Sequence, residues 1–150
     1  MALMPLIAAG PGTGAEGGVG DKFQHFNTLM AALPDWVQHW LVVQRFIFAL
    51  CLLFVIWQRE AQIYLAAILV SHALSLLEII VLPVDYMKLD LVALNHWVWI
   101  PVLIVFLWSW PKVEKLSAYG MWFLIATAQL IFSLIFDLRD GVAYLRFLLG

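Results

Sequence analysis

The sequence has few charged residues and only one cysteine. Of its 150 residues, 12% are Asp, Glu, Lys or Arg, against about a quarter in a soluble domain, while 65% are hydrophobic and the mean hydropathy is +0.95. This composition excludes a water-soluble fold and predicts a protein of the lipid bilayer. Because Cys51 has no second cysteine to pair with, a disulfide framework and dithiol chemistry within one chain are excluded as well.

The chain also lacks an excess of positive charge. Its 8 Lys and Arg residues against 10 Asp and Glu residues give a net charge of −2. Such a chain presents no basic surface that neutralises phosphates, so no nucleic-acid partner is expected. The expected partners are membrane lipids and other membrane proteins.

The N-terminal part of the chain is predicted to stay outside the hydrocarbon. Residues 1–9 are apolar, but no Lys or Arg precedes them, which argues against a removable signal peptide. The glycines that follow predict a flexible tail over residues 1–20. Asp21 and Gln24 have the spacing of a capping box, and apolar residues then recur at helical spacing. We therefore predict a short amphipathic helix in the membrane interface over residues 21–34.

Four long apolar segments follow, each with about the 20 residues that cross about 30 Å of hydrocarbon. The predicted spans are residues 36–57, 61–82, 91–110 and 117–136. Their connections are short, which makes neighbouring helices antiparallel. The predicted fold is therefore all-α, a four-transmembrane-helix antiparallel bundle over residues 35–137 with a short N-terminal interfacial helix. Residues 138–150 are predicted to form an interfacial C-terminal segment.

The aromatic residues support this topology, because Trp and Tyr prefer the headgroup level of a membrane. Near the face that carries both chain ends, called face A here, fall Trp36, Trp40, Tyr86, Trp97 and Trp99. Near the opposite face, called face B, fall Trp57, Tyr64, Trp108, Trp110, Tyr119 and Trp122. Lys and Arg are almost balanced between the faces. The short basic loops of face B slightly favour it as the cytoplasmic face, with both termini on the other side.

Polar side chains inside the predicted spans are costly in hydrocarbon, so they carry most of the functional information. Glu78 continues a ridge of small residues on the second span, which turns it toward the bundle or a partner chain. Arg45 is long enough to bend toward the depth of Glu78, and we predict an intramembrane ion pair between them. The other candidates for this polar cluster are Asn95, His96, Gln129 and, near the midplane, His72.

Two interpretations of the cluster stay open at this point. Polar contacts routinely hold membrane helices in register, which is a purely structural role. An intramembrane Arg, Glu and His can also mark a ligand or proton path.

Two further functions are alternatives. His39 and His96 have matching depths, as two ligands of a haem between helices would, so a haem- or quinone-binding redox subunit is the first alternative. An enzyme acting on a lipid or sterol-like substrate is the second, with Glu78 and His96 as acid and base. No metal-ligand signature, P-loop or nucleophile motif is present in the sequence, so catalysis is not favoured and no metal is expected. The favoured function is a non-catalytic small integral membrane protein that acts as a subunit of a homo- or hetero-oligomeric membrane complex.

Overall fold

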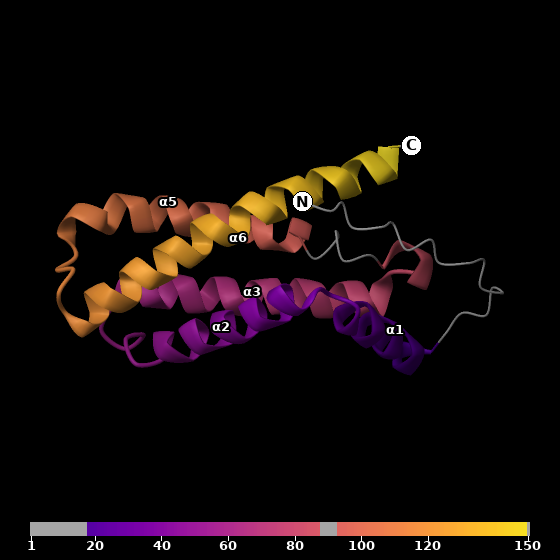
Figure 1. Ribbon diagram of the computed structural model, residues 1–150, viewed down its shortest axis with the longest axis horizontal. Coiled ribbons are helices and arrows are strands. Elements are labelled where there is room, and N and C mark those ends of the chain that lie inside the picture. The colour runs from indigo at the N-terminus through magenta and orange to yellow at the C-terminus, as the bar shows by residue number, and fades with distance from the viewer. Residues whose placement is uncertain (1–17, 88–92, 150) are drawn as a thin grey trace.

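The computed structural model describes residues 18–87 and 93–149, and every regular element in these ranges is a helix (Figure 1). Nearly all of the predicted tail, residues 1–20, lies outside the described residues. The first helix is α1 (Val19–Ala31). It begins two residues earlier than predicted, because Asp21 lies inside its first turn and accepts a hydrogen bond from the Gly18 amide at 2.9 Å.

Helix α2 (Asp35–Cys51) follows directly after Pro34. The Gln38 side-chain amide donates to the Leu33 carbonyl at 2.9 Å and to the Ala31 carbonyl at 3.4 Å, and so satisfies the last carbonyl of α1. The regular part of α2 ends at Cys51, six residues before the predicted end of the first span. Beyond it, backbone bonds to carbonyls three or four residues back continue the coil as tight turns up to Gln58.

Helix α3 (Arg59–Val81) is 23 residues long and ends before Pro83, which cannot donate a backbone hydrogen bond. The short 3₁₀ helix η1 (Val84–Tyr86) follows it. Helix α1 packs against α3, and Lys22 donates its Nζ to the carbonyl of Ile80 at 3.0 Å. A positive charge is favourable at this position because the last carbonyls of a helix carry partial negative charge.

The third apolar segment is built from the 3₁₀ helix η2 (His96–Val98), helix α5 (Trp99–Ser109) and the 3₁₀ helix η3 (Trp110–Lys112). Pro101 lies where η2 passes into α5, and it cannot donate to the carbonyl of residue 97. The irregular start of this segment therefore coincides with a backbone position that cannot complete a regular helix.

Helix α6 (Ala118–Leu149) is 32 residues long, about 48 Å at 1.5 Å per residue. It begins beside the α5–α6 connection, where a Cβ on Gly120 would clash with the carbonyl of Glu114. Only glycine allows this close approach. The helix runs past residue 136 without a break, so the residues from 138 to 149 continue the fourth predicted span as helix.

Among the described residues, three helical segments are long and apolar enough to cross a membrane, which indicates a membrane protein. They are Arg59–Val81, Ala93–Lys112 and Ala118–Leu149. Helix α2 contacts both α3 and α6, α5 contacts both α3 and α6, and the α2–α3 and α5–α6 connections lie at one end of the molecule (Figure 1). The core between these helices is aromatic and aliphatic, and its largest fully buried side chains include Tyr64, Phe106, Phe123 and Leu130.

Candidate functional site: polar groups between and around the helices

One polar group lies where the last turns of α3 meet the start of the third apolar segment. Asn95, only 8% exposed, donates its side-chain amide to Oε2 of Glu78 at 2.6 Å and to Oγ of Ser75 at 3.3 Å. Glu78 and Asn95, both predicted members of the cluster, are therefore in direct contact. We call Ser75, Glu78, Asn95, His96 and Asp137 the Glu78 cluster.

His96 connects this cluster to α6. It follows Asn95 in the sequence, and its Nδ1 lies 3.1 Å from Oδ2 of Asp137. The Asp137 oxygen has no partner with hydrogen-bond geometry in the described structure, so the contact is an ion-pair approach when His96 is protonated. Sequence reasoning missed Asp137 because the fourth span was ended at residue 136, one position before it.

The same end of α6 holds the irregular start of the third segment in place. The Trp97 indole lies so close to Gly141 that an added Cβ would stand 2.9 Å from its Nε1. Tyr144, one turn further along α6, donates its hydroxyl to the Tyr86 carbonyl at 3.1 Å. These contacts and the Glu78 cluster attach the short 3₁₀ helices η1 and η2 to α3 and α6, so these irregular turns of backbone pack against protein.

A second polar group crosses the centre of the molecule. The hydroxyl of Tyr64 donates to Oε1 of Gln129 at 2.5 Å, and Gln44 donates its side-chain amide to Oγ of Ser133 at 2.8 Å. Gln129 also donates to Ser133 at 3.5 Å, so α2, α3 and α6 are joined by one chain of hydrogen bonds. Gln129 therefore belongs to this Tyr64 chain and has no hydrogen bond to Glu78.

The structure contradicts the prediction that Tyr64 belongs to the aromatic belt of face B. The side chain is fully buried and in contact with other aromatic rings. Trp122, assigned to the same belt, is also buried and donates its indole NH to the Ile47 carbonyl at 3.2 Å. The Tyr64 hydroxyl and the Trp122 indole NH both donate to acceptors inside the protein, so neither side chain needs a hydrogen-bond partner in the headgroup region.

Arg45 belongs neither to the Glu78 cluster nor to the Tyr64 chain of hydrogen bonds. Its neighbour Gln44 is on the inner side of α2, and one residue corresponds to a rotation of about 100° around the helix. Arg45 is exposed on the outer side, and no ion pair or hydrogen bond joins it to Glu78 or to another described residue. The predicted Arg45–Glu78 pair is therefore not formed, because it was based on depth and the two side chains point in different directions around the bundle.

His39 and His72, the two other histidines among the predicted site residues, are exposed as well. In both rings Nδ1 pairs with the carbonyl one turn earlier, His72 with Ile68 at 2.8 Å and His39 with Asp35 at 2.6 Å. Each ring therefore turns its Nε2 away from the helix backbone. No contact between His39 and His96 is present in the described parts of the chain, and no group of three metal-ligating side chains is found there either.

No protein-family model, no curated protein and no solved structure matches the chain. The arrangement itself must therefore carry any functional conclusion. The groups inside the molecule mostly satisfy one another, whereas Arg45 and His72 present polar atoms on the outer surface.

Proposed function

We propose that this protein is a non-catalytic subunit of a homo- or hetero-oligomeric membrane complex, and that α2 crosses the bilayer together with the three longer helical segments. Regular α2 has 17 residues, about 26 Å, and its hydrogen-bonded turns lengthen it up to Gln58. It contacts α3 and α6, which are both long enough to cross a membrane. Four crossings with short connections make consecutive helices antiparallel.

Arg45 carries the proposal. It lies ten residues after Asp35, about 15 Å along the helix axis, which places it near the middle of such a span. A charged side chain there costs at least a few kcal/mol when it faces hydrocarbon. With no partner among the described residues, the guanidinium is best accommodated by an acceptor from another chain.

The surface around Arg45 suits such a contact. Its exposed apolar neighbours include Val42 and Phe46, whose exposed fractions are 61% and 65%. Apolar side chains around one charged group give a helix both packing area and a position that fixes its register against a partner. The acceptor that fits a guanidinium best is a carboxylate, which it binds through two parallel hydrogen bonds. We call Val42, Val43, Arg45 and Phe46 the Arg45 face.

The test is the mass of the complex that the full chain forms in its own membrane, extracted with a polymer that retains lipid. We expect a particle with more than one protein chain, and we expect Arg45→Leu to release a single chain. Arg146→Leu is the matched control, because this arginine is also exposed but lies in the last turn of α6. A wild-type particle with one chain, or an unchanged complex in Arg45→Leu, would overturn the proposal.

Cysteine cross-linking separates the two kinds of complex. The buried Cys51 is replaced by Ala, and one new cysteine is placed at Val42 on the Arg45 face. A disulfide-linked dimer of this chain supports a homo-oligomer. A stoichiometric adduct with a different chain, formed when a benzophenone maleimide attached to the same cysteine is illuminated, supports a hetero-oligomer, and absence of both products contradicts a contact through this face.

A further inference from the structure

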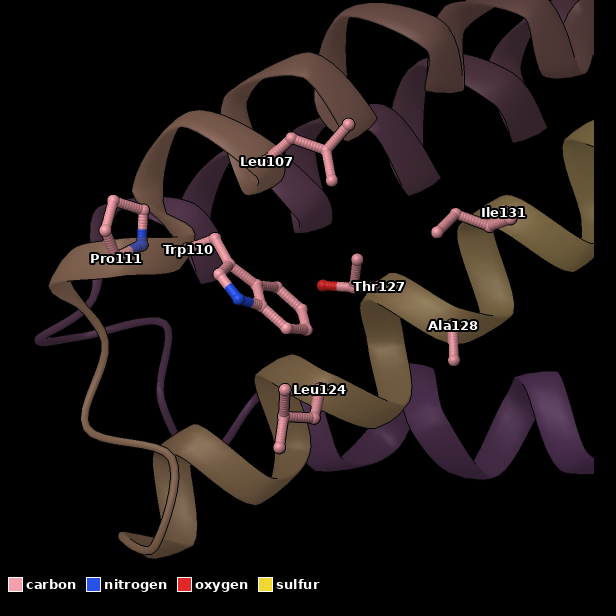
Figure 2. A pocket seen from close by; sticks show the side chains of 7 residues that line it. All are labelled: Leu107, Trp110, Pro111, Leu124, Thr127, Ala128 and Ile131. Carbon is pink, nitrogen blue, oxygen red and sulfur yellow. The ribbon is translucent and has the colours of Figure 1, made fainter.

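A groove opens between the C-terminal half of α5 and the first half of α6, and Figure 2 shows it from close by. Its volume is about 400 Å³, within the range of pockets that hold small molecules. The lining residues are Leu107, Trp110, Pro111, Leu124, Thr127, Ala128 and Ile131. The groove lies on two segments long and apolar enough to cross a membrane, so this inference does not depend on the proposed oligomer.

The lining selects an apolar occupant. Thr127 is the only lining residue with a hydroxyl, and this group donates to the Phe123 carbonyl of its own helix at 2.7 Å. It therefore has no proton left for a ligand. The lining side chains offer a sugar or peptide only the Trp110 indole NH and the Thr127 hydroxyl oxygen as hydrogen-bond partners, so most of its polar groups would be buried without partners, whereas a hydrocarbon chain needs none.

The position of the groove relative to the bilayer indicates which part of a ligand lies where. Trp57 and Trp108 are each 74% exposed near this end of the molecule, as expected of side chains at the headgroup level. From Leu124 to Ile131 the wall formed by α6 extends about 10 Å along the helix. One end of the groove is therefore near the headgroups and the other is within the hydrocarbon.

Positive charge lies at the headgroup end. Lys115 donates its Nζ to the Trp110 carbonyl and lies 5.6 Å from the centre of that indole ring, which itself lines the groove. Lys112, in η3, is exposed next to the lining residue Pro111. Glu114 lies in the same connection, which leaves one net positive charge on this short loop. Basic residues at the mouth of a groove between membrane helices favour an anionic lipid headgroup.

We propose that the α5–α6 groove binds one acyl chain of an anionic phospholipid whose phosphate lies beside Lys112 and Lys115. The groove supplies apolar contact for the chain, and the two ammonium groups supply charge complementary to the phosphate. Zwitterionic lipids with identical acyl chains share the first contribution, whereas the cation of their headgroup offsets most of the second.

Native mass spectrometry of the delipidated protein, titrated with dioleoyl phosphatidylglycerol or dioleoyl phosphatidylcholine, tests both contributions. We expect one tightly bound phosphatidylglycerol, and Lys112→Gln should weaken it by about fivefold while leaving phosphatidylcholine unchanged. Ala128→Trp should weaken both lipids by about tenfold or more, because an indole would fill the groove. Ile125→Trp is the matched control, since Ile125 is an exposed residue of the same helix that does not line the groove.

Equal affinity of the wild type for the two lipids overturns the proposal, and so does equal weakening by Ala128→Trp and Ile125→Trp. If Ala128→Trp fails to fold, the wild type decides the matter with a phosphatidylglycerol that carries a diazirine in its acyl chain. The expected photo-adducts lie between residues 107 and 131. Adducts distributed evenly over the exposed helix faces contradict a site in the groove.

Discussion

Glu78 and Arg45 carry opposite charges on neighbouring helices, and the surroundings of the two side chains differ. Glu78 is half-buried between α3 and the start of the third apolar segment, where Asn95 donates to it at 2.6 Å. Arg45 lies on the outer face of α2 with no described partner, among exposed apolar side chains. A charge that is satisfied within the chain contributes to the fold, whereas an exposed charge on α2 would call for an acceptor from another chain if α2 crosses the bilayer as proposed.

The uncharged polar groups show the same contrast. Tyr64 is fully buried, and its hydroxyl begins the chain of hydrogen bonds through Gln129. His72 lies on the same helix two turns further, is exposed, and bonds only to its own helix. The buried hydroxyl on the inner side of α3 therefore has its hydrogen-bond partner within the chain. Substitutions can test the difference between inner and outer polar side chains.

The largest effect is expected from Tyr64→Ala. The ring contacts Phe48, Trp99, Phe106 and Trp122, and its hydroxyl satisfies Gln129. Loss of a large buried aromatic should lower the free energy of unfolding by about 3–5 kcal/mol. The measurement is unfolding of the detergent-solubilised protein by increasing amounts of sodium dodecyl sulfate. Trp108→Ala removes an exposed ring and serves as control, and a similar loss in both variants would contradict the contrast between inner and outer side chains.

A smaller loss is expected from Glu78→Ala. The change removes the nearer of the two acceptors of the Asn95 side-chain amide, and Asn95 is only 8% exposed. A buried donor that loses its acceptor costs about 1–3 kcal/mol. Glu78→Gln keeps a side-chain oxygen at this position and should recover most of the stability in the same unfolding assay. Equal destabilisation by Ala and Gln would mean that the charge of Glu78, and not its hydrogen bond, stabilises the cluster.

The sequence predicts the depth of a residue in the membrane better than it predicts the direction in which the side chain points around its helix. Composition and the lengths of the apolar runs predict helices and membrane-crossing segments, because hydrocarbon requires both. Depth also identified Glu78, Asn95 and His96 as polar residues at similar levels. Depth does not determine the rotation of α2 about its axis. A prediction from depth alone therefore pairs Arg45 with Glu78, although the two side chains lie on different sides of the bundle.

Two other errors have equally specific causes. The sequence predicts an interfacial position for Tyr64 because tyrosine is enriched at membrane interfaces, and it does not show that Gln129 lies opposite the Tyr64 hydroxyl. Asp137 was left out because charged residues usually mark the end of a span, yet α6 continues through it and brings it to His96. Both contacts are between residues far apart in the sequence, and one sequence alone does not contain that information.

Tyr144→Phe tests the attachment of the 3₁₀ helix η1 to α6. The variant removes a hydroxyl that donates to the Tyr86 carbonyl at 3.1 Å and keeps the ring. The expected loss is about 0.5–1.5 kcal/mol, as for a typical intramolecular hydrogen bond. Hydrogen exchange of the amides around η1 should increase in the variant while exchange in the centre of α3 stays unchanged. Faster exchange in both places would instead indicate that Tyr144 stabilises the whole fold.

The smallest effect on the isolated chain is expected from Arg45→Leu, although the same change should have the largest effect on assembly. An exposed side chain without an intrachain partner contributes within about 0.5 kcal/mol to the stability of a single chain, so unfolding of the monomer in detergent should hardly change. Arg45→Lys keeps a positive charge and should retain part of the complex, because an ammonium group cannot form the two parallel bonds of a guanidinium. If Arg45→Leu instead destabilises the monomer by as much as Glu78→Ala, the guanidinium has an acceptor within its own chain. The proposal that the Arg45 face contacts a partner chain would then have no support, because Arg45 and Glu78 would both have their partners within the chain.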